Sequence, residues 1–182
     1  MVYKRVILKR GKEESLKRFH PWVFSGAIAR MDNIEEGDLV TVYDHEGNLI
    51  GNGHYQIGSI AVRILTFDDT EIDSAFFVKR LTEAFKMRQA LGLSRPDNNA
   101  FRLVHGEGDF LPGLVVDIYG STAVMQAHSP GMHFARNLIA DALTQLPNGV
   151  VKNVYYKSET TLPYKAQLDP QNEYIVGEYD TD

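Results

Sequence analysis

The chain has 182 residues, of which 43% are hydrophobic and 24% are charged, and its formal net charge is −5. This composition is typical of a globular protein with one domain or two small ones, and it excludes an intrinsically disordered chain. Because the chain contains no cysteine, disulfides, thiolate metal sites and a cysteine nucleophile are excluded within it. No apolar run approaches the roughly 18 residues of a membrane span, so we expect a cytoplasmic protein without a membrane partner.

The charges are segregated along the chain. Residues 1–30 contain eight lysines and arginines against two acids, whereas residues 31–73 contain one arginine against ten acids. A basic segment on an acidic body can steer a phosphate backbone to one face of a protein. On charge alone, a solvated charged surface explains the same pattern equally well.

Short strands dominate the first 70 residues. The expected strands cover residues 3–8, 38–44, 49–55 and 59–65. Turn signals separate them, among them His45-Glu46-Gly47-Asn48, which has the length of a hairpin connection. Several short strands at close spacing are typical of a small β barrel, which we place in residues 1–72.

From residue 73 the apolar residues change to helical spacing. Asp73 is suited to cap a helix and Gly92 to end it. A second helix is predicted after Ser129-Pro130, and it continues to about Leu146. The strands expected around these helices cover residues 101–104, 113–119, 122–127 and 150–156. This order predicts an α+β domain over residues 73–182, with a sheet faced by helices.

The stretch RLVHGEGDFLPGLVVDIYG (102–120) concentrates four glycines between two expected strands. A phosphate-binding loop, an acid/base pair and a tight turn are the alternatives. Leu111 stands where the third glycine of a dinucleotide fingerprint belongs, and a strand follows instead of a helix, which argues against a phosphate loop. Glu107 and Asp109 could form an acid/base pair, but acids at turns more often bond to the backbone. We predict no catalytic residue, and we assign a structural role to Trp22 and to Gly106, Glu107, Asp109, Pro112 and Gly113.

In KRFHPWVFSGAI (17–28), two bases, a histidine and the only tryptophan surround a proline. Positive charge beside aromatic rings is typical of proteins that bind unpaired bases of RNA. The candidate RNA-binding residues are Lys9, Arg10, Lys12, Lys17, Arg18 and His20. We expect Trp22 in the core, because a barrel of about 70 residues needs large apolar side chains. The six histidines include no H-x-x-x-H pair on a helix, so we predict no metal site.

Two stretches, RGKEESLKRFHPWVFSGAI and RLVHGEGDFLPGLVVDIYG, together resemble bacterial S-adenosylmethionine (SAM)-dependent methyltransferases that modify carbon 5 of a cytosine in large-subunit ribosomal RNA. The resemblance extends over nearly the whole chain, including EGDLVTVYDHEGNLIGNGHY. It implies an amino-terminal PUA domain, which is a small RNA-binding barrel, and an α+β middle domain. It also implies large-subunit ribosomal RNA as the partner.

The same resemblance implies a third, Rossmann-like domain that binds SAM and uses a cysteine nucleophile. We expect no cofactor in this chain itself, because it has no cysteine and no segment that reads as a strand, glycine turn and helix of the cofactor-binding kind. SAM is expected in a catalytic domain beyond Asp182, so that this chain is the RNA-positioning portion of a longer enzyme. The alternative is a protein–protein interaction or homodimerisation module, which uses exposed sheet edges and needs no nucleic acid.

Overall fold

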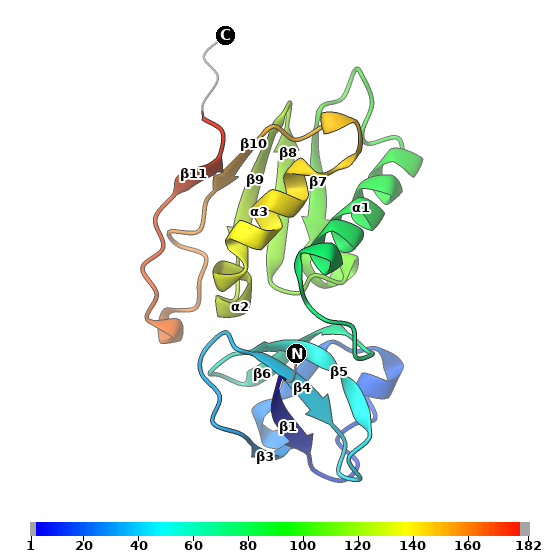
Figure 1. The fold of residues 1–182 in the computed structure, drawn as a ribbon, viewed down its shortest axis with the longest axis vertical. Helices are drawn as coiled ribbons and strands as arrows, with labels where there is room; N and C mark the ends of the chain where they lie inside the picture. The colour runs from blue at the N-terminus through cyan, green and yellow to red at the C-terminus, as the bar shows by residue number, and fades with distance from the viewer. Residues whose placement is uncertain (1–2, 179–182) are drawn as a thin grey trace.

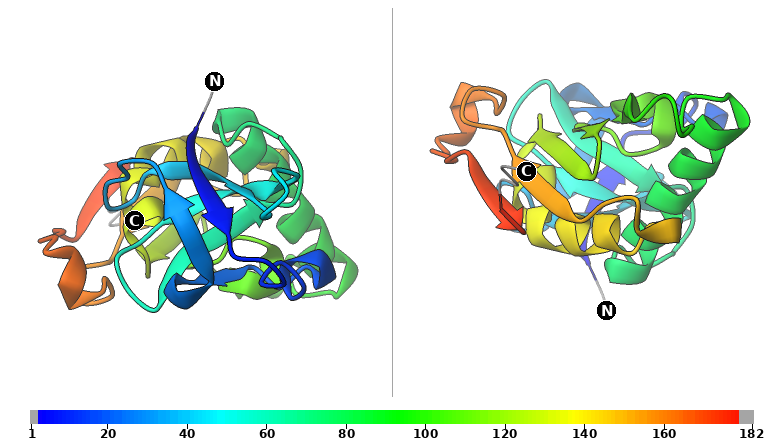
Figure 2. Two further views of the ribbon diagram at one scale, coloured as in Figure 1. Left: turned by 90° about the horizontal axis from the view of Figure 1, so that it is seen from below. Right: turned by 90° about the horizontal axis from the view of Figure 1, so that it is seen from above.

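Two β-sheets, each with its own hydrophobic core, organise the chain in the computed structural model, which describes residues 3–178 (Figure 1). The first sheet has six strands in the order β2-β6-β5-β4-β1-β3. Its strands are β1 (Lys4–Leu8), β2 (Trp22–Phe24), β3 (Ile28–Met31), β4 (Leu39–Tyr43), β5 (Leu49–Tyr55) and β6 (Ile60–Thr66). The end-on views in Figure 2 show this sheet curling on itself, as the predicted barrel requires.

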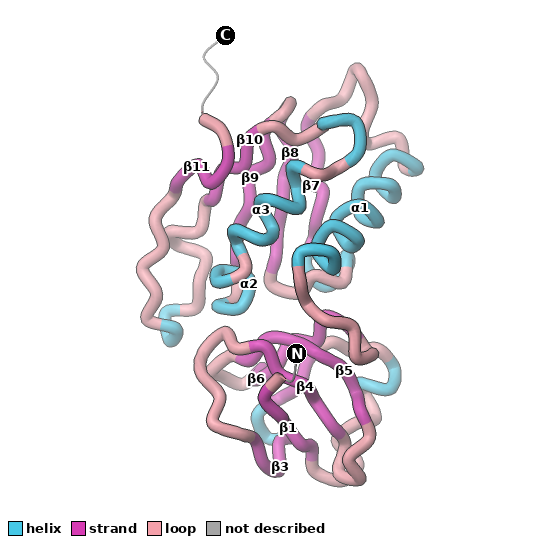
Figure 3. Tube along the Cα trace, in the orientation of Figure 1, coloured by secondary structure: helices cyan, strands magenta, loops and turns pink. Residues whose placement is uncertain are grey.

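The second sheet has five strands in the order β11-β10-β9-β8-β7. Its strands are β7 (Ala100–His105), β8 (Leu114–Tyr119), β9 (Thr122–Ala127), β10 (Asn153–Tyr156) and β11 (Glu173–Val176), and its helices are α1 (Ser74–Ala90), α2 (Pro130–Phe134) and α3 (Arg136–Thr144). Helix α1 packs against α3, and both cover one face of the sheet (Figures 1 and 3). This arrangement confirms the predicted α+β fold with a sheet faced by helices.

Helix α1 begins where the sequence predicts it. The Asp73 carboxylate accepts a hydrogen bond from the backbone N–H of Phe76 at 2.9 Å, which satisfies one of the free donors of the first turn. The chain leaves the helix at Gly92, whose φ of +69° lies in the left-handed region that suits glycine. The buried face of the helix carries Phe77 and Leu81 into the core of the second domain.

The second predicted helix is wrong in one respect, because the backbone at Ala135 (φ −80°, ψ 0°) divides it into α2 and α3. These helices connect β9 to β10, which pair in parallel and so form one β-α-β unit. The sequence does not predict this unit, since parallel pairing joins strands that are far apart in the chain. Pro130, Gly131 and Met132 at the start of α2 are buried, so this turn offers no open site for a phosphate.

A row of three residues across the first sheet faces the second domain; we call it the docking row. Register places Trp22 of β2 and His54 of β5 on either side of Arg63 of β6. Residues directly opposite one another in antiparallel strands share a face, so the three side chains point to the same side. The imidazole of His54 lies so close to Gly131 that a Cβ there would overlap it. The Trp22 indole N–H donates to a Glu107 carboxylate oxygen at 2.9 Å.

Among residues 3–178, no helix has the length and apolar character needed to cross a bilayer.

The buried His54 predicts that acid weakens the fold. Burial lowers the pKa of His54 from 6.5 to about 4, so the unfolded chain takes up the proton first as the pH falls. The contribution of the neutral ring to the free energy of unfolding is fully present above pH 6.5. It is lost as the pH falls from 6.5 to about 4, by up to roughly 3 kcal/mol. Chemical denaturation at about pH 7.5 and about pH 4.5 should therefore show a smaller acid-induced loss in His54→Gln than in the wild-type chain. His45→Gln, at an exposed turn, should keep the wild-type loss; an equal loss in His54→Gln would contradict the assignment.

Gly131→Ala is expected to destabilise the chain because the new methyl group would overlap the His54 ring. Overpacking of this kind costs about 1–3 kcal/mol in the free energy of unfolding. Gly108→Ala is the matched control, since a Cβ there meets nothing within 4 Å. Urea denaturation measures both, and a Gly131→Ala variant as stable as Gly108→Ala would show that the helix start is not tightly packed on the first sheet.

Candidate nucleic-acid interface

The segment between β1 and β2 places basic side chains on the surface of the first sheet. All six candidate RNA-binding residues are exposed: Lys9, Arg10, Lys12, Lys17, Arg18 and His20. The Lys9 ammonium donates to the backbone carbonyl of Gly26 at 2.8 Å. Lys17 lies 3.8 Å from a Glu13 carboxylate oxygen and 3.9 Å from one of Glu14. The charge of Lys17 is thus partly compensated, whereas Lys9 keeps no carboxylate within ion-pair distance among the described residues.

A groove of about 360 Å³ runs along this segment, and we call it the aromatic groove. It is lined by Lys12, Ser15, Leu16, Trp22, Val23, Phe24, Gly26 and Ala27. The edge of the His20 imidazole meets the Trp22 ring at a centroid distance of 5.4 Å. The structure therefore places Lys12 in the lining of the groove and His20 against Trp22, and it holds Lys9 at Gly26, another lining residue. Arg10 and Arg18 are exposed but do not line the groove.

Trp22 is not in the barrel core, so the expectation for this residue is wrong. Successive residues of a strand point to opposite faces, and in β2 the core position belongs to Val23, which is 1% exposed. Trp22 is half-buried and Phe24 is 49% exposed on the other face. Their ring centroids lie 6.4 Å apart. The strand thus presents two neighbouring aromatic rings outside the core.

Sequence reasoning missed Phe19, which is 67% exposed and adjoins the basic residues. Its φ of +63° ends the short 3-10 helix Leu16–Arg18 in the left-handed region. This turn directs the ring against Phe67, with the ring centroids 5.2 Å apart in an edge-to-face arrangement. An exposed non-glycine residue with positive φ is uncommon, and the sequence pattern carries no signal for it.

The glycine-rich stretch forms a 3-10 turn, Gly106–Asp109, between β7 and β8. The chain passes through the left-handed region at Gly106 (φ +53°), Phe110 (φ +57°) and Gly113 (φ +86°). A Cβ at Gly113 would overlap the Ser129 side chain, so a larger residue is excluded there on two grounds. The adjoining Pro112 is buried.

Asp109 is committed to structural contacts. Its carboxylate accepts two hydrogen bonds from the Arg88 guanidinium, both at 2.6 Å, and a third from the backbone N–H of His105 at 2.6 Å. The Asp109 side chain is 3% exposed and that of Arg88 is 11% exposed. Such a bidentate pair is short, charge-assisted and shielded from water. It joins α1 to the turn and leaves this carboxylate no free role in proton transfer.

Glu107 faces the other way, toward the first sheet. It is exposed, and the oxygen that accepts from Trp22 is its Oε1. The two acids of the turn therefore serve different partners: one holds the turn on α1, and the other holds the first sheet on the turn. Within residues 3–178, no group of histidines and acids is arranged to hold a metal ion.

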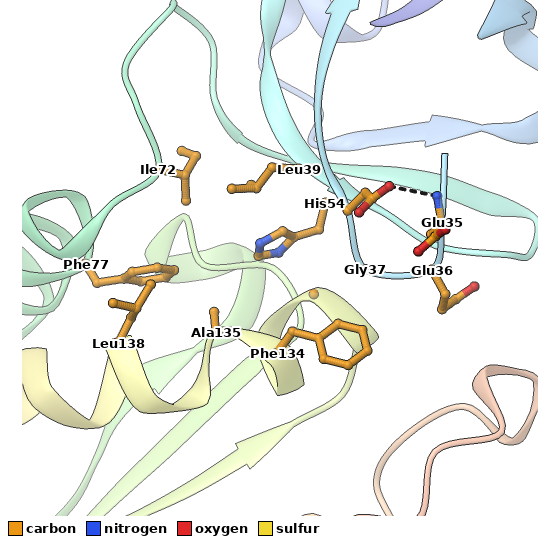
Figure 4. Close-up of a pocket in the computed structure, with 12 residues that line it drawn as sticks. Glu35, Glu36, Gly37, Leu39, His54, Ile72, Phe77, Phe134, Ala135 and Leu138 are labelled. Carbon is orange, nitrogen blue, oxygen red and sulfur yellow. Dashed lines mark hydrogen bonds between the residues drawn. The ribbon is translucent and has the colours of Figure 1, made fainter. Parts of the chain in front are cut away.

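A cavity of about 440 Å³ lies beside His54, between the first sheet and α3 (Figure 4). Its walls are apolar at Phe77, Phe134 and Leu138, and Glu35 and Glu36 stand at its other side. Asp38 lines the cavity as well, and three acids beside apolar walls would repel a phosphate backbone. The charges thus favour the aromatic groove over this cavity as the nucleic-acid surface.

Comparison with known sequences gives a consistent result. Residues 6–67 match the family model described as a PUA-like domain. The chain is 38% identical over 181 residues to Ribosomal RNA large subunit methyltransferase I of Klebsiella pneumoniae, and 37% identical over 177 residues to the protein of the same name in Escherichia coli. These matches cover 97% and 96% of this chain, but 44% of each relative. The chain thus spans less than half the length of these relatives.

Two solved structures share the fold. A protein of Streptococcus mutans assigned as a SAM-dependent methyltransferase superposes with a TM-score of 0.72, over 87% of this chain and 41% of that one, at 18% identity. A protein assigned as a methyltransferase and solved with SAH gives a TM-score of 0.77 over 100% of this chain and 44% of that one, at 16% identity. The likeness supports a fold of a PUA-like domain followed by an α+β domain.

Asp109→Asn is expected to lower the free energy of unfolding by about 3–5 kcal/mol, because it leaves the buried Arg88 charge uncompensated. Asp117→Asn is the control. Asp117 pairs with Arg102 at 2.8 Å, but the Arg102 side chain is 47% exposed, so this loss should be about 0–1 kcal/mol. Urea denaturation compares the two variants. Similar losses in both would show that the Arg88–Asp109 pair is not the stronger contact.

Proposed function

We propose that this chain is the RNA-recognition and positioning portion of a SAM-dependent methyltransferase that acts on carbon 5 of a cytosine in large-subunit ribosomal RNA. In this proposal residues 1–72 form the RNA-binding domain and residues 73–182 the middle domain, and neither is catalytic alone. The protein would act in the cytoplasm, on ribosomal RNA. The observation that carries the proposal is the aromatic groove, which lies in the PUA-like domain of a chain similar over 97% of its length to a ribosomal RNA large subunit methyltransferase.

The groove has the chemistry that single-stranded RNA needs. Lysines beside it can contact phosphates, and exposed rings can stack on unpaired bases. Lys12 lines the groove together with Trp22 and Phe24, and Lys9 is held beside it at the backbone carbonyl of Gly26. Lys17 contributes less in the free chain because of Glu13 and Glu14. We therefore assign backbone contacts first to Lys9 and Lys12 and place His20 against a base or sugar.

SAM, which supplies the methyl group when bound, does not fit the described part of this chain. Three of the four strand pairs in the sheet from β7 to β11 are antiparallel and join neighbours in sequence, unlike the doubly wound parallel sheets that hold nucleotide cofactors. The start of α2, which follows the parallel strand β9, is covered by His54. These features support a SAM site in the portion of the longer relatives that this chain does not match.

Neutralising the two groove lysines tests the proposal. The double variant Lys9→Gln/Lys12→Gln should bind single-stranded fragments of large-subunit ribosomal RNA more weakly than the wild-type chain. Two lost phosphate contacts should also reduce the slope of log affinity against log salt by about 1.4, measured by fluorescence anisotropy between about 50 and 200 mM KCl.

Lys79→Gln/Lys86→Gln is the matched control, since it removes the same charge from exposed positions of α1. It should keep the wild-type slope. Equal weakening by both double variants would mean that net charge, and not the groove, governs binding. RNA affinity insensitive to salt, together with self-association in sedimentation, would favour the alternative of a dimerisation module through the sheet edges β7 or β11.

A further inference from the structure

A small pocket of about 200 Å³ lies between the two domains, and we call it the junction pocket. Gly106 and residues 113–115 line one part of it, and four residues with polar side chains line the rest: Arg63, His105, Glu107 and His128. Arg63 comes from the docking row of the first sheet, whereas the other three come from the second domain. The pocket therefore exists only where the two domains meet.

Arg63 stands in this pocket without a carboxylate within 4.0 Å among the described residues. Its Nη1 donates to the side-chain oxygen of Gln56, and its other donors have no protein partner in residues 3–178. Burial lowers the pKa of Arg63, and the charge of Glu107 opposes this shift. A guanidinium stays charged at neutral pH. Because a half-buried cation is partly removed from water, a polar ligand that accepts hydrogen bonds from its free donors would stabilise it.

Glu107 supplies the complementary acceptor. The hydrogen bond from Trp22 occupies Oε1, and Oε2 has no partner among the described residues. A carboxylate in the pocket disfavours a phosphate group. An acceptor next to a donor instead matches the edge of a nucleobase that carries an amino group beside a ring nitrogen or carbonyl. The volume is small compared with drug-sized pockets of roughly 300–1,000 Å³, which suits one base.

Trp22 links the aromatic groove to the junction pocket. One side of the Trp22 ring lines the groove, and its indole N–H bonds the carboxylate that lines the pocket. The groove and the pocket thus lie on neighbouring sides of the Trp22–Glu107 contact. Burial and the nearby Arg102 lower the pKa of His128, so at neutral pH this ring can accept or donate a hydrogen bond without adding charge.

We propose that the junction pocket binds one unpaired base of the RNA, with Glu107 accepting from its exocyclic amino group and Arg63 donating to the adjacent ring nitrogen or carbonyl. This inference rests on the proposed function and adds a specificity site to it. Adenine, cytosine and guanine carry an exocyclic amino group, and uracil does not. The donor of uracil on this edge is its ring N3–H, which lies between two carbonyl oxygens, and one of these would face the Glu107 carboxylate. The pocket therefore favours a base with an exocyclic amino group over uracil at one position of the strand.

The test uses the 182-residue chain and oligouridine RNAs that carry one central cytosine or none. Wild-type protein should bind the cytosine-containing strand about tenfold more tightly. Glu107→Gln should reduce this preference to about twofold, since an amide can also donate to uracil, and should leave the salt slope unchanged. The glutamine oxygen can still accept from Trp22, so the domains remain docked. Glu173→Gln, at an exposed carboxylate of β11, is the control and should keep the full preference.

A second readout needs no substitution. A 2-aminopurine placed at the central position keeps an amino group and should change its fluorescence when wild-type protein binds. Loss of preference in Glu107→Gln and a fluorescence change together support the pocket. RNA binding that depends on Lys9 and Lys12 but shows neither base preference nor a fluorescence change would overturn the pocket and leave the proposed function standing. Absence of any RNA binding by the wild-type chain would overturn both.

Discussion

The docking row is the polar part of the junction between the two domains, where Leu65 of β6 also packs in the second core, and the two candidate RNA surfaces depend on this junction. Three strands of the first sheet each contribute one side chain: His54 packs on a glycine of the second domain, Trp22 bonds to Glu107, and Arg63 lies between them. A charged His54 would be costly in this position, and burial keeps the ring neutral. The junction is thus a packed contact that tolerates only small or matched residues on the facing side.

The glycine-rich turn supports this junction from the second domain. Its two acids have opposite environments: Asp109 is buried in a bidentate pair with Arg88, and Glu107 is exposed toward the first sheet. The buried pair fixes the turn against α1, so that the exposed acid is presented at a defined place. In the sequence the two carboxylates of this motif look alike. In the structure Asp109 stabilises the turn, and Glu107 contacts the first sheet.

Local signals in the sequence predict much of the fold, and longer-range contacts explain the rest. The Asp73 cap, the glycine that ends α1 and the turn signals between the strands β4 to β6 are local, and the structure contains these elements. Strands β2 and β3 have three and four residues, too few for a period to be recognised. The parallel pairing of β9 with β10 and the break at Ala135 depend on tertiary contacts.

The candidate site was predictable in its location but not in its geometry. The basic and aromatic composition of residues 9–24 marks the segment, yet composition cannot tell which face of a three-residue strand turns inward. Val23 takes the core position, and the other face of β2 meets the second domain. There Trp22 bonds to Glu107, which lies 85 residues later in the chain. Arg63 and His54 carry no motif of their own. Their importance comes from pairing across strands, which only the folded sheet brings about.

Attachment at two separate points has a mechanical consequence. A single contact would let one domain swing about the other, but His54 on Gly131 and Trp22 on Glu107 are separate contacts that together restrain this motion. The distance between the aromatic groove and the junction pocket is then fixed. For an RNA strand that contacts both surfaces, this distance sets the number of nucleotides between the two contact points. A bulge of one extra nucleotide between the two contact points would have to be accommodated by the RNA itself.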